Sequence, residues 1–160
     1  MNQHKQQEFI SLIDEYQKIL HSICRIYTDN SIDHEDLFQE MLVQLWKGYA
    51  RYKGDAKVST WIYRVSLYTA ITYIKKVIRR RSLKDQPEND LVYHQKAEES
   101  EEDLLLIAIK QLEEADRGFI LLYLEDKSYQ EMSDILGITE SNVGVKLNRI
   151  KSKLKLIMTK

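Results

Sequence analysis

The sequence has few residues that interrupt helices and little that could cross-link the chain or anchor it in a bilayer. One proline and five glycines among 160 residues predict long helices rather than a sheet with many turns. The single cysteine, Cys24, excludes an internal disulfide, and its place on an apolar face predicts a small buried side chain. No apolar run approaches the roughly 20 residues that span a bilayer, and the polar residues 1–5 are not typical of a signal peptide. We therefore expect a cytoplasmic protein without membrane insertion.

The chain also has little net charge, but its charges are unevenly distributed. The formal total is −1 at pH 7, and the 43% hydrophobic and 31% charged residues exclude general disorder. Residues 1–84 carry 14 Lys and Arg against 9 Asp and Glu, residues 85–116 carry 2 against 11, and residues 117–160 carry 8 against 5. Two basic blocks therefore flank an acidic middle, a pattern that a near-zero total conceals.

The stretch 128–156 has the pattern of two helices joined by a tight turn. Ser128 followed by Glu131 forms a capping box at a helix start, and Gly137 stands where a left-handed C-terminal cap is needed. Thr139 can cap the next helix. The inner face of that second helix is a stripe with helical spacing, made of Val143, Leu147, Ile150, Leu154 and Ile157. This arrangement predicts a helix-turn-helix, whose second helix enters a DNA major groove.

The face opposite this stripe is polar and basic, as a DNA-reading helix requires. Helical spacing brings together on it Ser141, Asn142, Val145, Lys146, Arg149 and Lys153. Asn can pair with adenine, Lys and Arg reach guanine edges or phosphates, and Val can touch a thymine methyl group. A solvated face of an ordinary helical hairpin is the alternative. The capping box, the glycine and the unbroken stripe together favour DNA binding.

The N-terminal half predicts three further helices. The first spans about residues 5–28 with an apolar stripe that starts at Phe9, the second is capped by Asp33, and the third runs from Ser59 or Thr60 to about Arg81. The last turns of the third helix hold a run of basic residues, Lys75, Lys76, Arg79, Arg80 and Arg81, with Lys84 beyond. Cations suit a helix C-terminus, but this number favours a track for phosphates.

Enzymatic and metal-binding functions find little support in the sequence. The run from Asp33 through His34 to Asp36 is the one acidic cluster with a histidine that suggests such a site. Consecutive residues on a helix do not converge on one point, and no partner cluster occurs elsewhere. His4 and His21 have no second histidine at the spacing of a metal site. We expect no catalytic residue, no metal and no cofactor.

Three motifs carry a family resemblance. Residues 36–40, D-L-F-Q-E, resemble the D-L-x-Q-E signature of bacterial RNA polymerase sigma factors. Residues 57–64, K-V-S-T-W-I-Y-R, are similar to the K-F-S-T/F-x-T-W-L-Y-R block that follows in the same family. Residues 129–137, Y-Q-E-M-S-D-I-L-G, resemble its C-terminal Y-x-E-I-A-x-x-L-G. The short chain with both blocks is similar to the two-domain extracytoplasmic-function type, and the resemblance covers about residues 8–156.

The resemblance implies roles for individual residues. The first motif corresponds to a helix that docks on the clamp helices of the polymerase β′ subunit through Asp36, Gln39 and Glu40. The residues implied to open and bind the −10 element are Lys53, Lys57, Ser59, Thr60, Trp61, Tyr63, Arg64, Tyr68, Lys75, Lys76, Arg79 and Arg80. The aromatic and cationic members suit extruded bases and backbone. The residues implied to bind the −35 element are Arg117, Ser141, Asn142, Val145, Lys146, Arg149 and Lys153.

We therefore expect an all-α protein of two small helical bundles, residues 1–84 and 104–160, joined by a flexible acidic linker, residues 85–103. Its implied function is promoter recognition and transcription initiation as a dissociable polymerase subunit. The implied partners are core RNA polymerase (β′ clamp helices and β flap), double-stranded promoter DNA and the melted −10 strand; an anti-sigma partner is left open. The alternative is a free-standing helix-turn-helix regulator with an N-terminal dimerisation bundle. One departure from the family pattern is Gly144 inside the recognition helix, where glycine costs about 1 kcal/mol relative to alanine.

Overall fold

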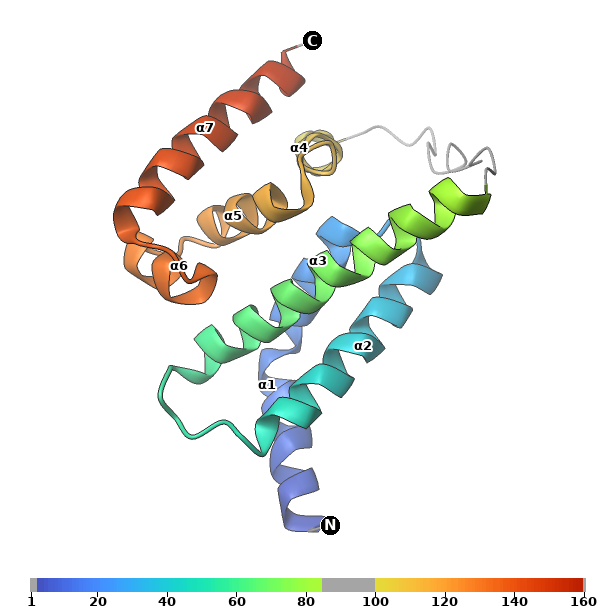
Figure 1. The fold of residues 1–160 in the computed structure, drawn as a ribbon, viewed down its shortest axis with the longest axis vertical. Helices are drawn as coiled ribbons and strands as arrows, with labels where there is room; N and C mark the ends of the chain where they lie inside the picture. The colour runs from blue at the N-terminus through green and yellow to red at the C-terminus, as the bar shows by residue number, and fades with distance from the viewer. Residues whose placement is uncertain (1–2, 85–99, 160) are drawn as a thin grey trace. The chain divides into compact units, whose positions relative to one another are not determined.

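The computed structural model describes residues 3–84 and 100–159, and these ranges fold entirely into helices and short connections (Figure 1). The helices are α1 (Gln3–Tyr27), α2 (Ser31–Tyr49), α3 (Val58–Lys84), α4 (Glu101–Ile109), α5 (Glu114–Leu124), α6 (Tyr129–Leu136) and α7 (Glu140–Met158). The prediction of an all-α fold is confirmed. Within the described ranges, no helix has both the length and the apolar character that a membrane span requires.

The chain forms two compact units, residues 1–70 and 71–160, whose boundary falls inside α3. Most of the predicted acidic linker, residues 85–99, lies outside the described residues. The last three residues of the predicted linker, 101–103, are helical. The hydroxyl of Ser100 accepts from the backbone N–H of Asp103 at 3.2 Å, and the Asp103 carboxylate accepts from the N–H of Ser100 at 3.3 Å, so a capping box starts α4 at Glu101. The division into residues 1–84 and 104–160 stays a prediction.

The core of the first unit is built from the apolar stripes of α1, α2 and the first half of α3. The fully buried side chains include Leu20, Ile23, Tyr27, Leu37, Met41, Leu45 and Ile62. Cys24 is buried among them, as predicted, and burial raises the pKa of its thiol to about 12. A thiol in this environment stays protonated and is therefore a packing group.

The start of α2 differs from the prediction that Asp33 caps this helix. The N-cap is Asn30, whose side-chain oxygen accepts from the backbone N–H of Asp33 at 2.8 Å. The amide of Asn30 also donates to the Asp33 carboxylate at 2.9 Å. Asp33 therefore stands three residues after the N-cap and is its hydrogen-bond partner. Helix α2 begins at Ser31.

The helix-turn-helix of the second unit has the predicted caps. The hydroxyl of Ser128 accepts from the N–H of Glu131 at 3.1 Å, and the Glu131 carboxylate accepts from the N–H of Ser128 at 3.1 Å. Gly137 has φ 71° and ψ 31°, the left-handed conformation that favours glycine, and it ends α6. Thr139 caps α7 by accepting from the N–H of Asn142 at 3.1 Å. These local contacts set the turn between α6 and α7.

Packing in the second unit also follows the predicted stripe. Val143, Leu147 and Ile150 of α7 are fully buried, and the last two members of the stripe, Leu154 and Ile157, are half-buried. Helix α7 packs against α4, α5 and α6. The other buried side chains of this unit include Ile109, Leu112, Phe119, Ile120, Leu122, Met132 and Ile135. With its stripe covered in this way, α7 presents the opposite face outward.

Two histidines that the sequence interpretation treated separately meet between α1 and α2. Nδ1 of His21 lies 3.0 Å from Nε2 of His34, and the His21 ring stacks on Phe38 with centroids 4.6 Å apart. Burial, and then the charge of His21, lower the pKa of His34. Two imidazoles can share a hydrogen bond only while at least one is neutral. Protonation of both rings therefore replaces this contact by repulsion.

We expect this pair to make the folded state less stable in acid. Because the folded pKa of His34 is depressed, the unfolded chain binds a proton more readily below about pH 6.5. The stabilising contribution is present above that value and is lost as the pH falls through the lowered folded pKa. His34→Gln should therefore reduce the decrease in the free energy of unfolding between pH 7.5 and pH 5, measured by urea denaturation. His4→Gln, at the far end of α1, is the control; an unchanged decrease in His34→Gln would rule out this contribution.

Candidate nucleic-acid interface

A groove of about 440 Å³ lies between the C-terminal part of α2 and the first half of α3. Its lining residues are Gln44, Lys47, Gly48, Arg51, Arg64, Val65, Tyr68 and Thr69. Three of these residues are cations, and the Tyr68 side chain at the groove is 74% exposed. Binding sites for single-stranded nucleic acid combine cations, which contact the phosphate backbone, with aromatic rings, which stack on the bases.

The groove brings together two residues that the sequence pointed to and three that it did not. Arg64 and Tyr68 were implied by the family resemblance. Gln44, Lys47 and Arg51 were missed as binding residues. Part of their signal is present in the sequence, because a spacing of three places Gln44 and Lys47 on one face of α2, and Arg51 follows directly after the helix. Only the packing of α3 shows that this face borders a groove.

Several residues implied to contact DNA serve instead in the packing of α3. Tyr63 is 2% exposed and Thr60 is 7% exposed, so the geometry does not support the implied contacts of these two side chains with extruded bases. Trp61 is half-buried: its indole stacks against Tyr52 with centroids 4.9 Å apart, and it covers Gly48. Ser59 is half-buried as well, whereas Lys53 and Lys57 are exposed in the loop before α3.

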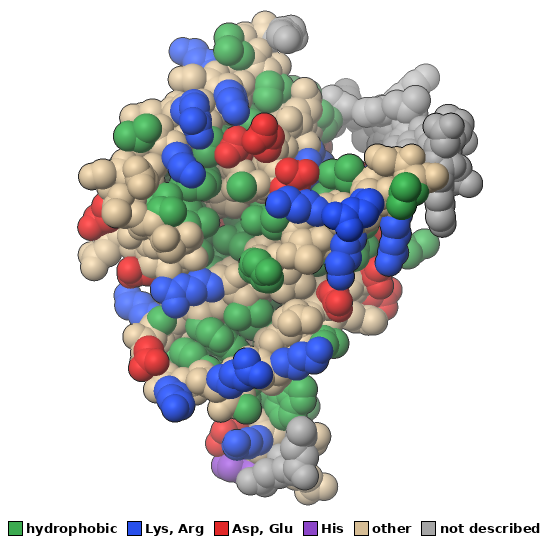
Figure 2. All heavy atoms as spheres, viewed as in Figure 1, with side chains coloured by type: hydrophobic (Ala, Val, Ile, Leu, Met, Phe, Trp, Pro, Cys, Tyr) green, Lys and Arg blue, Asp and Glu red, His purple; other side chains and the backbone are tan. Residues whose placement is uncertain are grey.

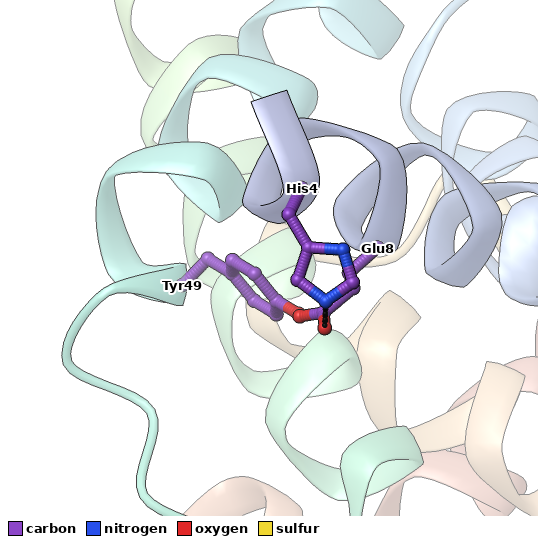
Figure 3. Close-up of polar contacts among 3 residues, drawn as sticks. All are labelled: His4, Glu8 and Tyr49. Atoms are coloured by element: carbon purple, nitrogen blue, oxygen red, sulfur yellow. Dashed lines mark hydrogen bonds and ion pairs between the residues drawn. The ribbon is translucent and has the colours of Figure 1, made fainter. Parts of the chain in front are cut away.

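The end of α2 beside this loop is held by Tyr49. Its ring lies 5.4 Å from Phe9 and 6.4 Å from Trp61, measured between centroids. Its hydroxyl donates to Oε2 of Glu8 at 3.3 Å, and Oε1 of the same carboxylate lies 2.9 Å from Nε2 of His4 (Figure 3). Desolvation, followed by the charge of Glu8, raises the pKa of Tyr49. The phenol therefore stays neutral and keeps donating to α1.

The second half of α3 carries the predicted basic run on its surface. Lys75, Lys76, Arg79 and Arg80 are all exposed, and Figure 2 shows Lys and Arg side chains gathered over this part of the helix. Their number and exposure suit contacts with phosphates, which depend on charge rather than on sequence.

The outward face of α7 has the residues that the helix-turn-helix prediction required. Ser141, Asn142, Lys146 and Arg149 are exposed, and Val145 is 67% exposed. The ammonium of Lys146 lies 6.0 Å from the centre of the Phe119 ring of α5. These residues occupy the first two to three turns of α7, the part of a recognition helix that reaches base edges.

Two other residues implied to bind the −35 element have partners inside the unit. Nζ of Lys153 lies 3.7 Å from Oδ2 of Asp116, a carboxylate on α5 that is largely buried. Nε of Arg117 donates to the Leu112 carbonyl at 3.1 Å, and its Nη2 donates to the Lys110 carbonyl at 2.7 Å. These contacts favour a structural role for Arg117 at the corner between α4 and α5. Contacts of Lys153 and Arg117 with DNA stay predictions.

Gly144, the departure from the family pattern, lies under an aromatic ring of α6. A Cβ atom at this position would stand 3.3 Å from Cε2 of Tyr129. That distance is tighter than ordinary contacts, so a side chain here would displace the partly exposed ring. The glycine therefore lets α6 and α7 approach closely at the start of the recognition helix.

A second surface lies on the outer face of α2. Asp36, Gln39 and Glu40 are exposed there, and two apolar side chains flank them, Ile32 at 78% and Val43 at 45% exposure. The sequence motif did not indicate either apolar residue as part of a binding surface. An acidic centre between exposed apolar ends is a composition that suits a protein partner.

A third surface is an apolar groove of about 330 Å³ between the C-terminal parts of α5 and α7. It is lined by Ile120, Tyr123, Leu124, Lys151, Leu154, Lys155, Met158 and Thr159. The Lys151 ammonium stands 4.0 Å from the centre of the Tyr123 ring. Leu124 and Met158 are about half exposed.

The residues that the structure describes contain no group of three or more His, Cys, Asp and Glu that could hold a metal ion.

Family models match the two halves of the chain separately. The model described as Sigma-70 region 2 matches residues 12–82. The model described as Sigma-70, region 4 matches residues 103–154. The first match includes the groove and the outer face of α2, and the second includes the helix-turn-helix.

Individual proteins resemble the chain over most of its length. RNA polymerase sigma factor YlaC of Bacillus subtilis is 29% identical over 157 residues, which cover 91% of this chain and 88% of that protein. ECF RNA polymerase sigma-E factor of Haemophilus influenzae is 22% identical over 177 residues, which cover 99% and 93%. Among solved structures, the sigma factor RpoE of Bartonella quintana, in complex with the anti-sigma factor NepR, has the same fold, with a TM-score of 0.69 and 15% identity over 99% of this chain and 98% of that one.

Proposed function

Because the chain belongs to the extracytoplasmic-function type of the sigma-70 family and directs promoter recognition by RNA polymerase, we propose that separate surfaces of the chain divide this work. The outer face of α2 docks on core polymerase, the cationic groove receives the melted −10 strand, and α7 reads the −35 element. The observation that carries the proposal is the convergence of Lys47, Arg51, Arg64 and exposed Tyr68 on one groove. The chain is a non-enzymatic subunit of the transcription machinery, which we place in the cytoplasm.

The −10 strand fits the groove by charge and by ring chemistry. Lys47 comes from α2, Arg51 comes from the loop that follows α2, and Arg64 comes from α3, so the cations that border the groove come from three segments. The Tyr68 ring is exposed enough to stack on an extruded base, an interaction that contributes about 1–3 kcal/mol per base. Lys53 and Lys57 in the loop, and Lys75, Lys76, Arg79 and Arg80 farther along α3, would extend this track for phosphates.

The outer face of α2 fits a basic, partly apolar site on another protein. Asp36 and Glu40 are one helical turn apart, so both carboxylates point outward together. Exposed Ile32 and Val43 lie on the same side and add apolar area at both ends. We assign this face to the β′ clamp helices, as the resemblance of residues 36–40 implies.

The apolar groove at the ends of α5 and α7 suits a second polymerase contact. Its lining combines apolar side chains, among them Ile120, Leu124 and Leu154, with the cations Lys151 and Lys155. An apolar segment with acidic neighbours fits this combination, and we assign the groove to the β flap. Lying on the side of α7 where its buried stripe ends, the groove would leave the DNA-reading face accessible.

An anti-sigma factor is a further partner that we propose. The similar RpoE chain is bound to the anti-sigma factor NepR, and a protein that covered the α2 face or the apolar groove here would exclude polymerase. A ternary complex of this chain, its anti-sigma factor and core polymerase would contradict such a mechanism. The free-standing regulator considered above is not supported, because the Sigma-70 region 2 match occupies residues 12–82, where that alternative needs a dimerisation bundle.

We expect Glu40→Lys to abolish tight binding to core polymerase. Glu40 is exposed, so the fold should survive, while an interfacial carboxylate whose partner is left unpaired costs about 2–5 kcal/mol. Affinity for core polymerase, measured by fluorescence anisotropy, should therefore fall by at least tenfold. Asp14→Lys reverses an exposed charge on α1 and is the matched control. Wild-type affinity in Glu40→Lys would show that this face does not dock on the clamp.

We expect Lys146→Ala with Arg149→Ala to weaken recognition of the −35 element. If these side chains reach guanine edges, each loss should cost about 1–3 kcal/mol on the cognate element, measured as holoenzyme affinity for promoter DNA. On DNA with a scrambled −35 element, wild type and variant should bind alike. The control Lys18→Ala with Arg25→Ala removes the same charge from exposed positions on α1. Equal losses on cognate and scrambled DNA would indicate phosphate contacts alone.

The apolar groove can be tested with two leucines of the second unit. Leu124 lines the groove and is 47% exposed, whereas Leu156 is 67% exposed and is not among its lining residues. Leu124→Gln should reduce affinity for core polymerase by about 1 kcal/mol, because part of a leucine side chain is no longer buried on binding. Leu156→Gln, which makes the same chemical change, should bind like wild type. If both variants bind alike, the groove is not a polymerase contact.

A further inference from the structure

The loop between α2 and α3, residues 50–57, is held by few backbone contacts. The N–H groups of Arg51 and Tyr52 donate to the Gly48 carbonyl at 3.0 Å, and the next backbone hydrogen bond along the described chain runs from Trp61 to Lys57 at 3.0 Å. Between them, Gly54 has φ 82°, a left-handed conformation that favours glycine. Backbone hydrogen bonding alone therefore leaves the middle of the loop free to change shape.

The side chain of Tyr52 joins three parts of this loop. Its ring stacks on Trp61 in the first turn of α3, with centroids 4.9 Å apart and planes inclined by 23°. Its hydroxyl donates to the carbonyl of Ala56 at the far end of the loop. Its own N–H is bound to Gly48 at the end of α2. One half-buried residue thus ties the end of α2, the far end of the loop and the start of α3 together.

The loop carries charges that belong to the proposed nucleic-acid interface. Arg51, directly before Tyr52, lines the cationic groove. Lys53 follows Tyr52 directly, Lys57 follows Ala56, and both are exposed. The loop positions that Tyr52 fixes therefore lie next to three cations in the sequence, Arg51, Lys53 and Lys57. If the contacts of Tyr52 were lost, these cations could move, although none of them would be removed from the surface.

We propose that Tyr52 is a positioning residue that sets how the 50–57 loop meets the −10 element, and that it thereby determines discrimination between −10 sequences. The proposal rests on the assignment of the groove to the melted −10 strand. Tyr52 need not touch the DNA. Its ring and its hydroxyl hold Arg51, Lys53 and Lys57 in one arrangement, and preorganised contacts discriminate better than mobile ones.

The hydroxyl and the ring can be tested separately in reconstituted holoenzyme with the full chain. Tyr52→Phe keeps the stack on Trp61 and removes the donor to Ala56, whereas Tyr52→Leu removes both. The measurement is open-complex formation on a promoter identified by start-site mapping with wild-type holoenzyme, and on a panel of single substitutions in its −10 element. A second template set carries the same −10 sequences in an unpaired bubble, so that the cost of melting is removed.

The discrimination ratio is open-complex formation on the cognate −10 element divided by that on a substituted one. Tyr52→Phe should lower this ratio by about threefold to tenfold, the equivalent of one ordinary hydrogen bond. Tyr52→Leu should lower it further. The loss should persist on the bubble templates, because it concerns binding of the strand rather than melting. Affinity for core polymerase, dependence on the −35 element and the thermal midpoint should stay at wild-type values. Tyr129→Phe, which removes a partly exposed tyrosine hydroxyl from α6 in the second unit, is the matched control for the chemical change.

Two further variants separate failure of this inference from failure of the groove assignment. If Arg64→Ala and Lys47→Ala leave binding to the −10 strand unchanged, the groove assignment is wrong and the inference fails with it. If these variants weaken binding while Tyr52→Phe keeps the full discrimination ratio, only the role of Tyr52 is overturned. A Tyr52→Phe protein with a lowered thermal midpoint and weakened core binding would also overturn it, because the contact would then support the fold as a whole.

Discussion

An amphipathic helix in a small bundle can bury only one stripe of its surface, and the functional surfaces of this protein depend on that constraint. In α2, burial of Leu37, Met41 and Leu45 turns Asp36 and Glu40 outward. In α7, burial of Leu147 and Ile150 does the same for Lys146 and Arg149. The core and the binding faces are therefore two sides of the same helices. A substitution on the outer side changes a partner contact with little effect on packing.

Aromatic residues near the cationic groove divide between the core and the surface. Trp61 and Tyr63 have the chemistry to bind bases, but Tyr63 is buried and Trp61 packs between Gly48 and Tyr52. Tyr68, on the same helix, is exposed at the groove. The groove thus has one exposed ring, while the aromatic rings nearer the start of α3 are packed inside the unit. Through its contacts with Gly48 and Tyr52, Trp61 fixes the start of α3 against the end of α2, and a strand-binding surface requires such a fixed arrangement.

The charged residues of the second unit show a similar division. The buried carboxylate of Asp116 needs a cation, and Lys153 approaches it to 3.7 Å. The carbonyls of Lys110 and Leu112 in the turn between α4 and α5 need donors, and Arg117 supplies a hydrogen bond to each. Both residues belong by type to the set expected to bind DNA, but these nearby groups already engage them. Lys146 and Arg149 are exposed on α7 and carry the main basic character of the recognition helix.

The sequence by itself determined the helices, their caps around the helix-turn-helix and the family, because capping boxes, Gly137 and the 3.6-residue stripe are local features with local causes. It misassigned the cap of α2, where Asn30 and Asp33 both offer side-chain acceptors and only the backbone geometry distinguishes them. Tertiary structure alone decided which cations border a groove, which aromatics are buried and how Tyr52 closes its loop. These facts depend on side chains from different helices meeting in space, and helical periodicity describes only one helix at a time.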